Sequence, residues 1–139
     1  MLRPLSLTLG LTVALFLALG VSSPGATGKF SYGEEIADNG ALLVTFEENA
    51  MKRFASVDYQ LDGTVKTTIE VNGEQQSIAS RQTTATTVIP DKGIARGSLT
   101  LTDSVCTCGV TIREYLDLTL TNLATGKVYR LDPITRAFP

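Results

Sequence analysis

The sequence predicts an all-β protein, a small antiparallel β-sandwich built from meander hairpins, with a small closed up-and-down β-barrel as the alternative. Two observations lead to this fold class. Apolar and polar residues alternate along most of the chain beyond residue 40, and successive side chains of a strand point to opposite faces of a sheet. Turn sequences such as Asn72-Gly73 separate the alternating stretches, as tight hairpins require. After the N-terminal apolar run, no stretch has the pattern of a helix of normal length.

The N-terminus has the three-part organisation of a secretory signal peptide. A short start with one basic residue, Arg3, precedes an uncharged apolar run from Leu5 to Leu19, and small residues follow. We therefore expect a signal peptide over residues 1–23, cleaved somewhere between residues 20 and 26, and a secreted protein, extracellular or periplasmic. The apolar run is shorter than the ~20 residues of a transmembrane helix, so no membrane association is expected after cleavage. A single uncleaved anchor is the alternative.

The rest of the chain has the size of one domain with one hydrophobic core. Residues 24–40 are rich in Gly, Ser, Asn and acidic residues and predict an irregular lead-in with at most one short edge strand. A single all-β domain is expected over residues 41–139. Its first meander has strands joined by turns at Asp62-Gly63 and Asn72-Gly73, because type I′ turns favour Asn or Asp before Gly. The polar stretch Ser80–Thr87 is expected to be an edge strand or a solvated face, with O-glycosylation or an interaction surface as the alternative.

The longest alternation runs from Val110 to Thr121 and returns through Gly126 to Leu131, which predicts a hairpin. One face of this hairpin is expected to be buried, and it carries Val110, Ile112, Leu116, Leu118 and Leu120. The opposite face is expected to meet solvent and is the first candidate for an interaction surface, with a plain solvated face as the alternative. That surface comprises Arg113, Tyr115, Asp117, Thr119 and Tyr129.

Glu114 falls in the apolar phase of this strand, between Ile112 and Leu116, where an unpaired carboxylate would be unfavourable. It is therefore a candidate buried acid. One explanation is a bulge or barrel-mouth position with an arginine partner such as Arg96 or Arg130. The other is a polar anchor within a ligand cavity.

Composition excludes several classes of function. The chain has no histidine, so Ser-His-Asp catalysis and His-based zinc sites are excluded. It also has no tryptophan, the usual stacking platform for sugars, although its tyrosines offer a partial substitute. The net charge is −2 and no Lys/Arg stripe exists, so nucleic acid is not an expected partner. No constellation of residues predicts an enzyme or a cofactor.

Cys106-Thr107-Cys108 is the reactive motif of the sequence. In a regular strand the two Cα atoms would be ~6.6 Å apart, near the upper limit for a disulfide, whereas a turn brings them closer. A local disulfide that stiffens the turn is the first interpretation, because secretion leads to an oxidising compartment. Intermolecular pairing, free thiols, and a functional thiol pair are the alternatives. The functional pair would be redox-active or would hold Cu(I), with Met51 as a third ligand.

These observations lead to two functional hypotheses. The first is a secreted, non-catalytic β-domain that binds a protein or glycan partner through a sheet face, a strand edge or a cavity at one end. The second is a thiol-dependent redox or Cu(I)-handling exported protein that uses Cys106 and Cys108.

Overall fold

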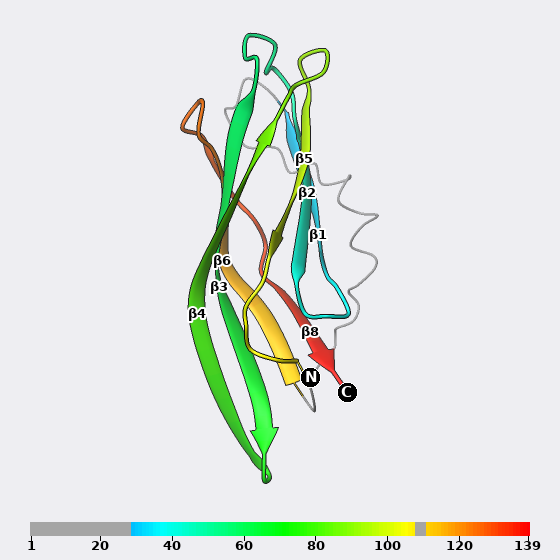
Figure 1. Cartoon of the computed structure of the whole chain (residues 1–139), viewed down its shortest axis with the longest axis vertical. Coiled ribbons are helices and arrows are strands. Elements are labelled where there is room, and N and C mark those ends of the chain that lie inside the picture. The colour runs from blue at the N-terminus through cyan, green and yellow to red at the C-terminus, as the bar shows by residue number, and fades with distance from the viewer. Residues whose placement is uncertain (1–28, 108–110) are drawn as a thin grey trace.

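The computed structural model describes residues 29–107 and 111–139, which form two antiparallel sheets and contain no helix (Figure 1). The three-stranded sheet has the order β1-β2-β5, where β1 is Phe30–Ile36, β2 is Leu42–Glu48 and β5 is Ala95–Leu101. The five-stranded sheet has the order β4-β3-β6-β7, with β8 also paired to β6. Its strands are β3 Val57–Val71, β4 Glu74–Val88, β6 Thr111–Asn122, β7 Val128–Arg130 and β8 Ile134–Phe138.

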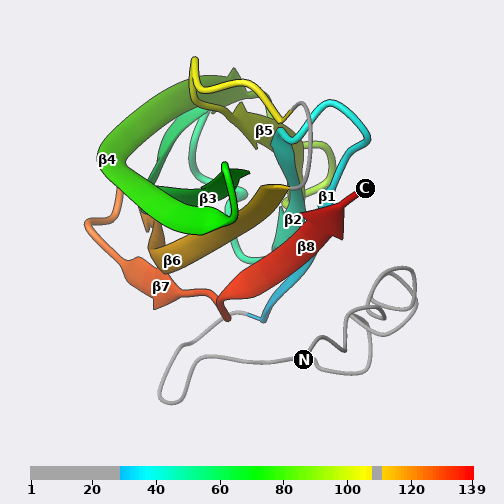
Figure 2. The ribbon, with the colours of Figure 1, turned by 90° about the horizontal axis from the view of Figure 1, so that it is seen from below.

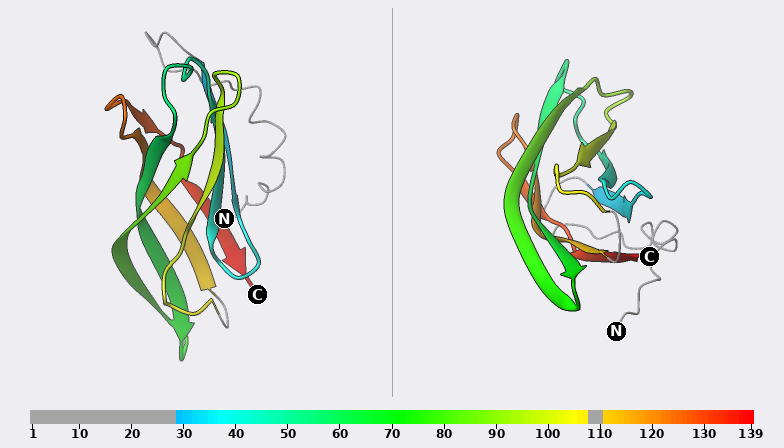
Figure 3. Two further views of the ribbon diagram at one scale, coloured as in Figure 1. Left: turned by 45° about the horizontal axis from the view of Figure 1, so that its top comes forward. Right: turned by 60° about the horizontal axis from the view of Figure 1, so that its bottom comes forward.

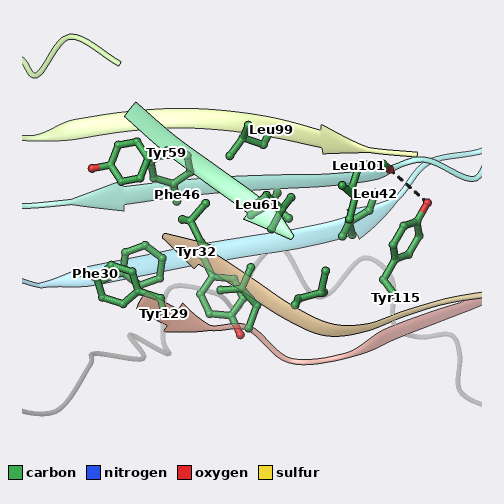
Figure 4. Packing of buried hydrophobic residues seen from close by; sticks show 14 of the residues in the cluster. Phe30, Tyr32, Leu42, Phe46, Tyr59, Leu61, Leu99, Leu101, Tyr115 and Tyr129 are labelled. Atoms are coloured by element: carbon green, nitrogen blue, oxygen red, sulfur yellow. Dashed lines mark hydrogen bonds between the residues drawn. The ribbon is translucent and has the colours of Figure 1, made fainter. Parts of the chain in front are cut away.

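The two sheets face each other across one core and, over the described residues, do not close into a barrel (Figure 2). The predicted sandwich is therefore confirmed. Inward side chains of both sheets meet in this core, which Figure 4 shows from close by. Phe30 of β1 stacks on Tyr129 of β7 with ring centroids 3.8 Å apart, and Phe46 packs against Tyr59 at 4.5 Å. Removal of this apolar surface from water is the main driving force for the pairing of the sheets. No helix in the described part of the chain is long and apolar enough to cross a membrane.

The sandwich begins earlier than we expected, because the predicted lead-in contains β1. This strand is the edge of the three-stranded sheet and pairs with β2 over its whole length, from Phe30↔Glu48 to Ile36↔Leu42. Its inward positions alternate Phe30, Tyr32, Glu34 and Ile36, all of them buried. The predicted short edge strand is present. Because one inward position is an acid, the alternation was not evident from the sequence.

The predicted turn at Asp62-Gly63 is wrong. β3 runs through these residues as one strand of 15 residues, with a register shift against β6 between Asp62 and Thr64. The glycine serves packing and not a turn. A Cβ atom at Gly63 would lie 2.5 Å from Leu118 Cδ2 and 3.2 Å from Leu101 Cδ2. The second signal, Asn72-Gly73, does form the tight turn, and both residues have positive φ angles of 51° and 81°.

A backbone irregularity in β6 reverses which of its side chains are buried. Asp117 has a φ of 49°, and it lies next to the register shift against β3. Before it, Thr111, Arg113 and Tyr115 are buried, whereas Ile112 and Leu116 are half-buried. After it, Leu118 and Leu120 are buried. The predicted buried face is therefore correct for the second half of the strand and wrong for the first half. Val110 lies outside the described residues.

Candidate functional site

The predicted interaction surface is not a surface. Arg113, Tyr115 and Tyr129 are buried, Thr119 is half-buried, and Asp117 is exposed. The prediction that these residues share one solvated face is wrong, because the irregularity at Asp117 turns Arg113 and Tyr115 into the core.

Arg113 and Tyr115 instead hold two loops at one end of the sandwich. The Arg113 guanidinium is 1% exposed and donates from Nε to Thr67 Oγ1 (3.0 Å), from Nη1 to Gly40 O (3.2 Å) and from Nη2 to Val105 O (2.5 Å). The Tyr115 hydroxyl donates to the same Gly40 oxygen at 2.5 Å. Burial raises the pKa of Tyr115, which keeps this hydroxyl protonated and able to donate. These contacts join the β1–β2 turn to the segment after β5, which is a structural role.

A buried carboxylate lies at the other end of the core. Glu48 is 3% exposed and accepts hydrogen bonds from the Tyr59 hydroxyl (2.7 Å), from Asn122 Nδ2 (2.8 Å) and from the Tyr129 hydroxyl. Burial, followed by the hydrogen bond to Glu48, raises the pKa of both tyrosines. We did not predict this cluster. The signal was present, because Glu48 continues the inward alternation of Leu42, Val44 and Phe46.

Glu34 is a second acid that we did not predict. It is 8% exposed, and its Oε1 atom is buried without a hydrogen-bond partner among the described residues. Burial raises the pKa of this carboxyl to about 8, with a further contribution from the charge of Asp132. The neighbouring Tyr32 hydroxyl accepts from the Asp132 backbone N–H at 3.0 Å. No group of three or more His, Cys, Asp or Glu side chains within the described ranges is placed to hold a metal ion.

Glu114, by contrast, is not buried. Its side chain is 28% exposed, and its carboxylate lies 4.0 Å from Lys66 Nζ. The predicted arginine partners do not contact it: Arg96 pairs with Glu47 at 2.5 Å, and no ion pair of the described residues includes Arg130. The prediction of a buried acid is wrong at this position because Glu114 belongs to the outer face of the five-stranded sheet.

Cys106 is disulfide-bonded, and the described residues include no free cysteine. Cys108 lies outside the described residues, so the pairing of the two cysteines stays a prediction. Met51 is too far from Cys106 to join it in a Cu(I) site. Met51 N–H donates to Gly93 O just before β5, whereas Val105 and Cys106 follow β5 at the Gly40 end. A strand of seven residues spans about 23 Å between these two ends.

The strongest candidate site is the free edge of β4. This strand is the outermost member of the five-stranded sheet, and it pairs with β3 from Val57↔Val88 to Val71↔Glu74 with no register shift. Figure 1 and both views of Figure 3 show the β3–β4 ribbon projecting past the three-stranded sheet. Every residue from Glu74 to Ala79 is exposed. The predicted polar edge strand is confirmed.

This edge lacks the usual protection against pairing. Natural edge strands are commonly short, or carry lysine, proline, inward charges or a bulge. Between Gln75 and Val88 the chain has one charged residue, Arg81, and no proline. Cross-strand hydrogen bonds also keep the ribbon regular, including Thr83 to Asp62 (2.6 Å) and Thr68 with Ser77 (2.9 Å). The edge is therefore a preformed template for another strand.

Apolar side chains are exposed at the projecting end of the ribbon. Val71 is 43% exposed and Ile78 is 48% exposed. Ile78 is opposite Thr67, whose side chain points into the core, so Ile78 lies on the inner face of the sheet.

The fold and this edge define a small antiparallel β-sandwich in which one long strand, β4, has an unpaired outer edge. Comparison with models of protein families, with curated proteins and with solved structures finds no match to the chain.

Proposed function

We propose that this protein is a secreted, non-catalytic binding domain that takes up an extended segment of a protein partner along β4. Backbone N–H and C=O groups of the edge would pair with the partner segment, as in other cases of strand addition. The observation that carries the proposal is the long, regular and nearly uncharged edge of β4.

The burial of the aromatic residues favours a protein over a glycan partner. All tyrosines of the chain are inside the sandwich: Tyr32, Tyr59, Tyr115 and Tyr129. The described surface therefore has no exposed tyrosine that could stack on a sugar ring in place of tryptophan.

Two substitutions at one position test the role of the edge. The Val71↔Glu74 pair flanks a two-residue turn, so its two residues are hydrogen-bonded to each other. Hydrogen-bonded and non-hydrogen-bonded pairs alternate along the ladder, so Ala79 belongs to a non-hydrogen-bonded pair. Its N–H therefore points away from β3. Ala79→Pro then removes an outward donor without breaking the β3–β4 ladder. Ala79→Val is the matched control, because it keeps the donor and favours a strand.

The measurement is capture of partners from extracellular fluid, followed by hydrogen exchange on the recovered complex. We expect wild type and Ala79→Val to retain the same protein, Ala79→Pro to lose it, and the complex to protect the outward amides of Gln75, Ser77, Ala79 and Arg81. Equal capture by Ala79→Pro, or protection confined to another surface, would refute strand addition at β4.

A further inference from the structure

We propose that the segment which pairs with β4 is β4 of a second copy of this chain, antiparallel and centred on Ile78. This inference rests on the proposed function, since it names the occupant of the same edge. In this register the residues pair as Ile78↔Ile78′, Ser77↔Ala79′, Gln76↔Ser80′, Gln75↔Arg81′ and Glu74↔Gln82′, where the prime marks the second copy.

The backbone geometry allows this pairing. Odd-numbered residues of β4 present their N–H and C=O groups outward, as derived for Ala79. A two-fold axis through Ile78 places outward Ser77 against outward Ala79 of the copy, and side chains on the same face of the joint sheet. The end of the β3–β4 ribbon projects past the three-stranded sheet (Figure 3), and every residue from Glu74 to Ala79 is exposed, so this part of the edge is accessible to a second ribbon.

Ile78 explains why this register is preferred. It is the one large apolar side chain between Glu74 and Thr87, and it is 48% exposed in the single chain. At the axis it occupies a pair without backbone hydrogen bonds, where opposite side chains approach most closely. Two isoleucines would then cover one another, which removes apolar surface from water in both copies.

The charges of the ribbon complement one another in the same register. Glu70 is opposite Gln75 on the outer face, and Gln75 is opposite Arg81 of the copy, so Glu70, Gln75 and Arg81′ form a row. The ends of this row are about 10 Å apart between Cα atoms, which two long side chains can bridge. In the single chain Arg81 Nη1 donates to Thr64 Oγ1 (3.1 Å) and to Asp117 O (3.5 Å), so the Arg81 side chain leaves these acceptors when it turns to Glu70 of the copy. No ion pair of the described residues includes Glu70 or Arg81. No like charges face each other directly.

Sedimentation velocity of the purified protein over a range of concentrations tests the dimer. We expect Ile78→Lys to weaken association at least tenfold, because it places two ammonium groups opposite one another at the axis. Ile89→Lys is the matched control, since Ile89 is 77% exposed but lies just beyond β4 and outside the paired segment. Equal association of wild type and Ile78→Lys would overturn the proposal.

Two further variants test the register. Ile78→Cys should form a disulfide-linked dimer in a glutathione buffer, whereas Ser77→Cys should not, because Ser77 faces Ala79′ and not itself. Arg81→Glu and Glu70→Arg should each weaken the dimer by placing like charges in the row, and the double variant should restore it. Cross-linking of Ser77→Cys instead, or failure of the double variant to recover association, would refute this register.

The outcomes separate this inference from the proposed function. A protein that stays monomeric at all concentrations but still captures another protein through an Ala79→Pro-sensitive edge would overturn the self-pairing and leave strand addition in place. A monomeric protein that captures the same partners with and without Ala79→Pro would overturn both the self-pairing and the strand addition.

Discussion

The carboxyl group of Glu34 makes the stability of the sandwich depend on pH. Its ordinary pKa is 4.5, whereas burial raises the pKa in the folded chain to about 8. Between these values the folded state holds a proton that the unfolded state has released, so the free energy of unfolding falls as pH rises from about 4.5 to about 8. The groups that face Glu34 do not reverse this direction, because Asp132 adds negative charge and Tyr32 stays protonated.

We therefore expect Glu34→Gln to stabilise the protein by about 1–3 kcal/mol at pH 8 and by little at pH 4. Urea unfolding at several pH values measures this. Glu35→Gln is the control, because Glu35 is the exposed neighbour on the opposite face of β1. Parallel pH profiles for wild type and Glu34→Gln would show that the Glu34 carboxyl does not set the dependence.

Glu48 differs from Glu34, because the side-chain oxygens of Glu48 accept hydrogen bonds from Tyr59, Asn122 and Tyr129. A glutamine there would present an amide N–H₂ to at least one of the Tyr59, Tyr129 and Asn122 donors. We expect Glu48→Gln to destabilise the fold by about 2–4 kcal/mol, measured by thermal or urea unfolding. Glu47→Gln, on the outer face of β2, should change stability by less than about 1 kcal/mol even though it breaks the pair with Arg96. Similar effects of the two changes would contradict a buried network.

The position of Glu48 was available from the sequence, because it continues the inward alternation of β2, whereas Glu34 itself interrupts the apolar alternation of β1. Alternation alone does not predict the burial of an acid, because the same pattern also indicated Glu114, which is half-exposed. The difference arises from the irregularity at Asp117, where a non-glycine residue adopts a positive φ. Asp tolerates a positive φ better than most residues, but an aspartate within a strand pattern does not by itself predict an irregularity, which here accompanies the register shift between β6 and β3.

At the scale of the element, two similar dipeptides have different roles. Asn72-Gly73 turns the chain, whereas Asp62-Gly63 continues a strand beneath Leu118. The two dipeptides differ in a contact from a distant strand, because Leu118 packs over Gly63 and nothing lies near Gly73. Turn propensity alone therefore predicts two hairpins, whereas the protein has one long β3–β4 hairpin. The hairpins themselves are local features, which is why Asn72-Gly73 and Gly126 were predicted correctly.

We expect Gly63→Ala to destabilise the protein by about 1–3 kcal/mol, because the new methyl group would meet the Leu118 side chain at 2.5 Å. The free energies of unfolding of Gly63→Ala, Leu118→Ala and the double variant, compared with wild type, form a double-mutant cycle. The double variant should be more stable than the sum of the single effects, since a smaller residue 118 makes room for the methyl group. Simple additivity would mean that the glycine is needed for another reason.

For the whole molecule, the sequence predicted the all-β class and the sandwich but not the strand order. The order of each sheet depends on pairs far apart in the chain, such as Leu42↔Leu101, which periodicity does not reveal. The predicted secretion and the pairing of Cys106 with Cys108 stay predictions.

The projecting end of the β3–β4 ribbon should contribute little to the stability of the sandwich. Replacing residues 70–75 by Asn-Gly joins Ile69 to Gln76 through the same kind of turn and removes mainly exposed residues. We expect the free energy of unfolding to change by less than about 1 kcal/mol. Self-association should weaken, because the pairs of Glu74 and Gln75 and the charge of Glu70 are removed, but it should persist through Ile78. Urea unfolding and sedimentation measure the two properties. A large loss of stability would show that the ribbon end supports the core.

The contact of Arg113 with Gly40 joins residues 73 positions apart. The guanidinium can be satisfied away from water only when the β1–β2 turn and the segment after β5 are both in place, so we expect this end of the sandwich to be completed late during folding. The β3–β4 ribbon needs no such distant partner and can form early. On the proposed self-pairing, a newly made chain exposes the outer edge of β4 while the rest of the sandwich is still assembling, and we expect nascent molecules to associate prematurely when the protein is made at high concentration.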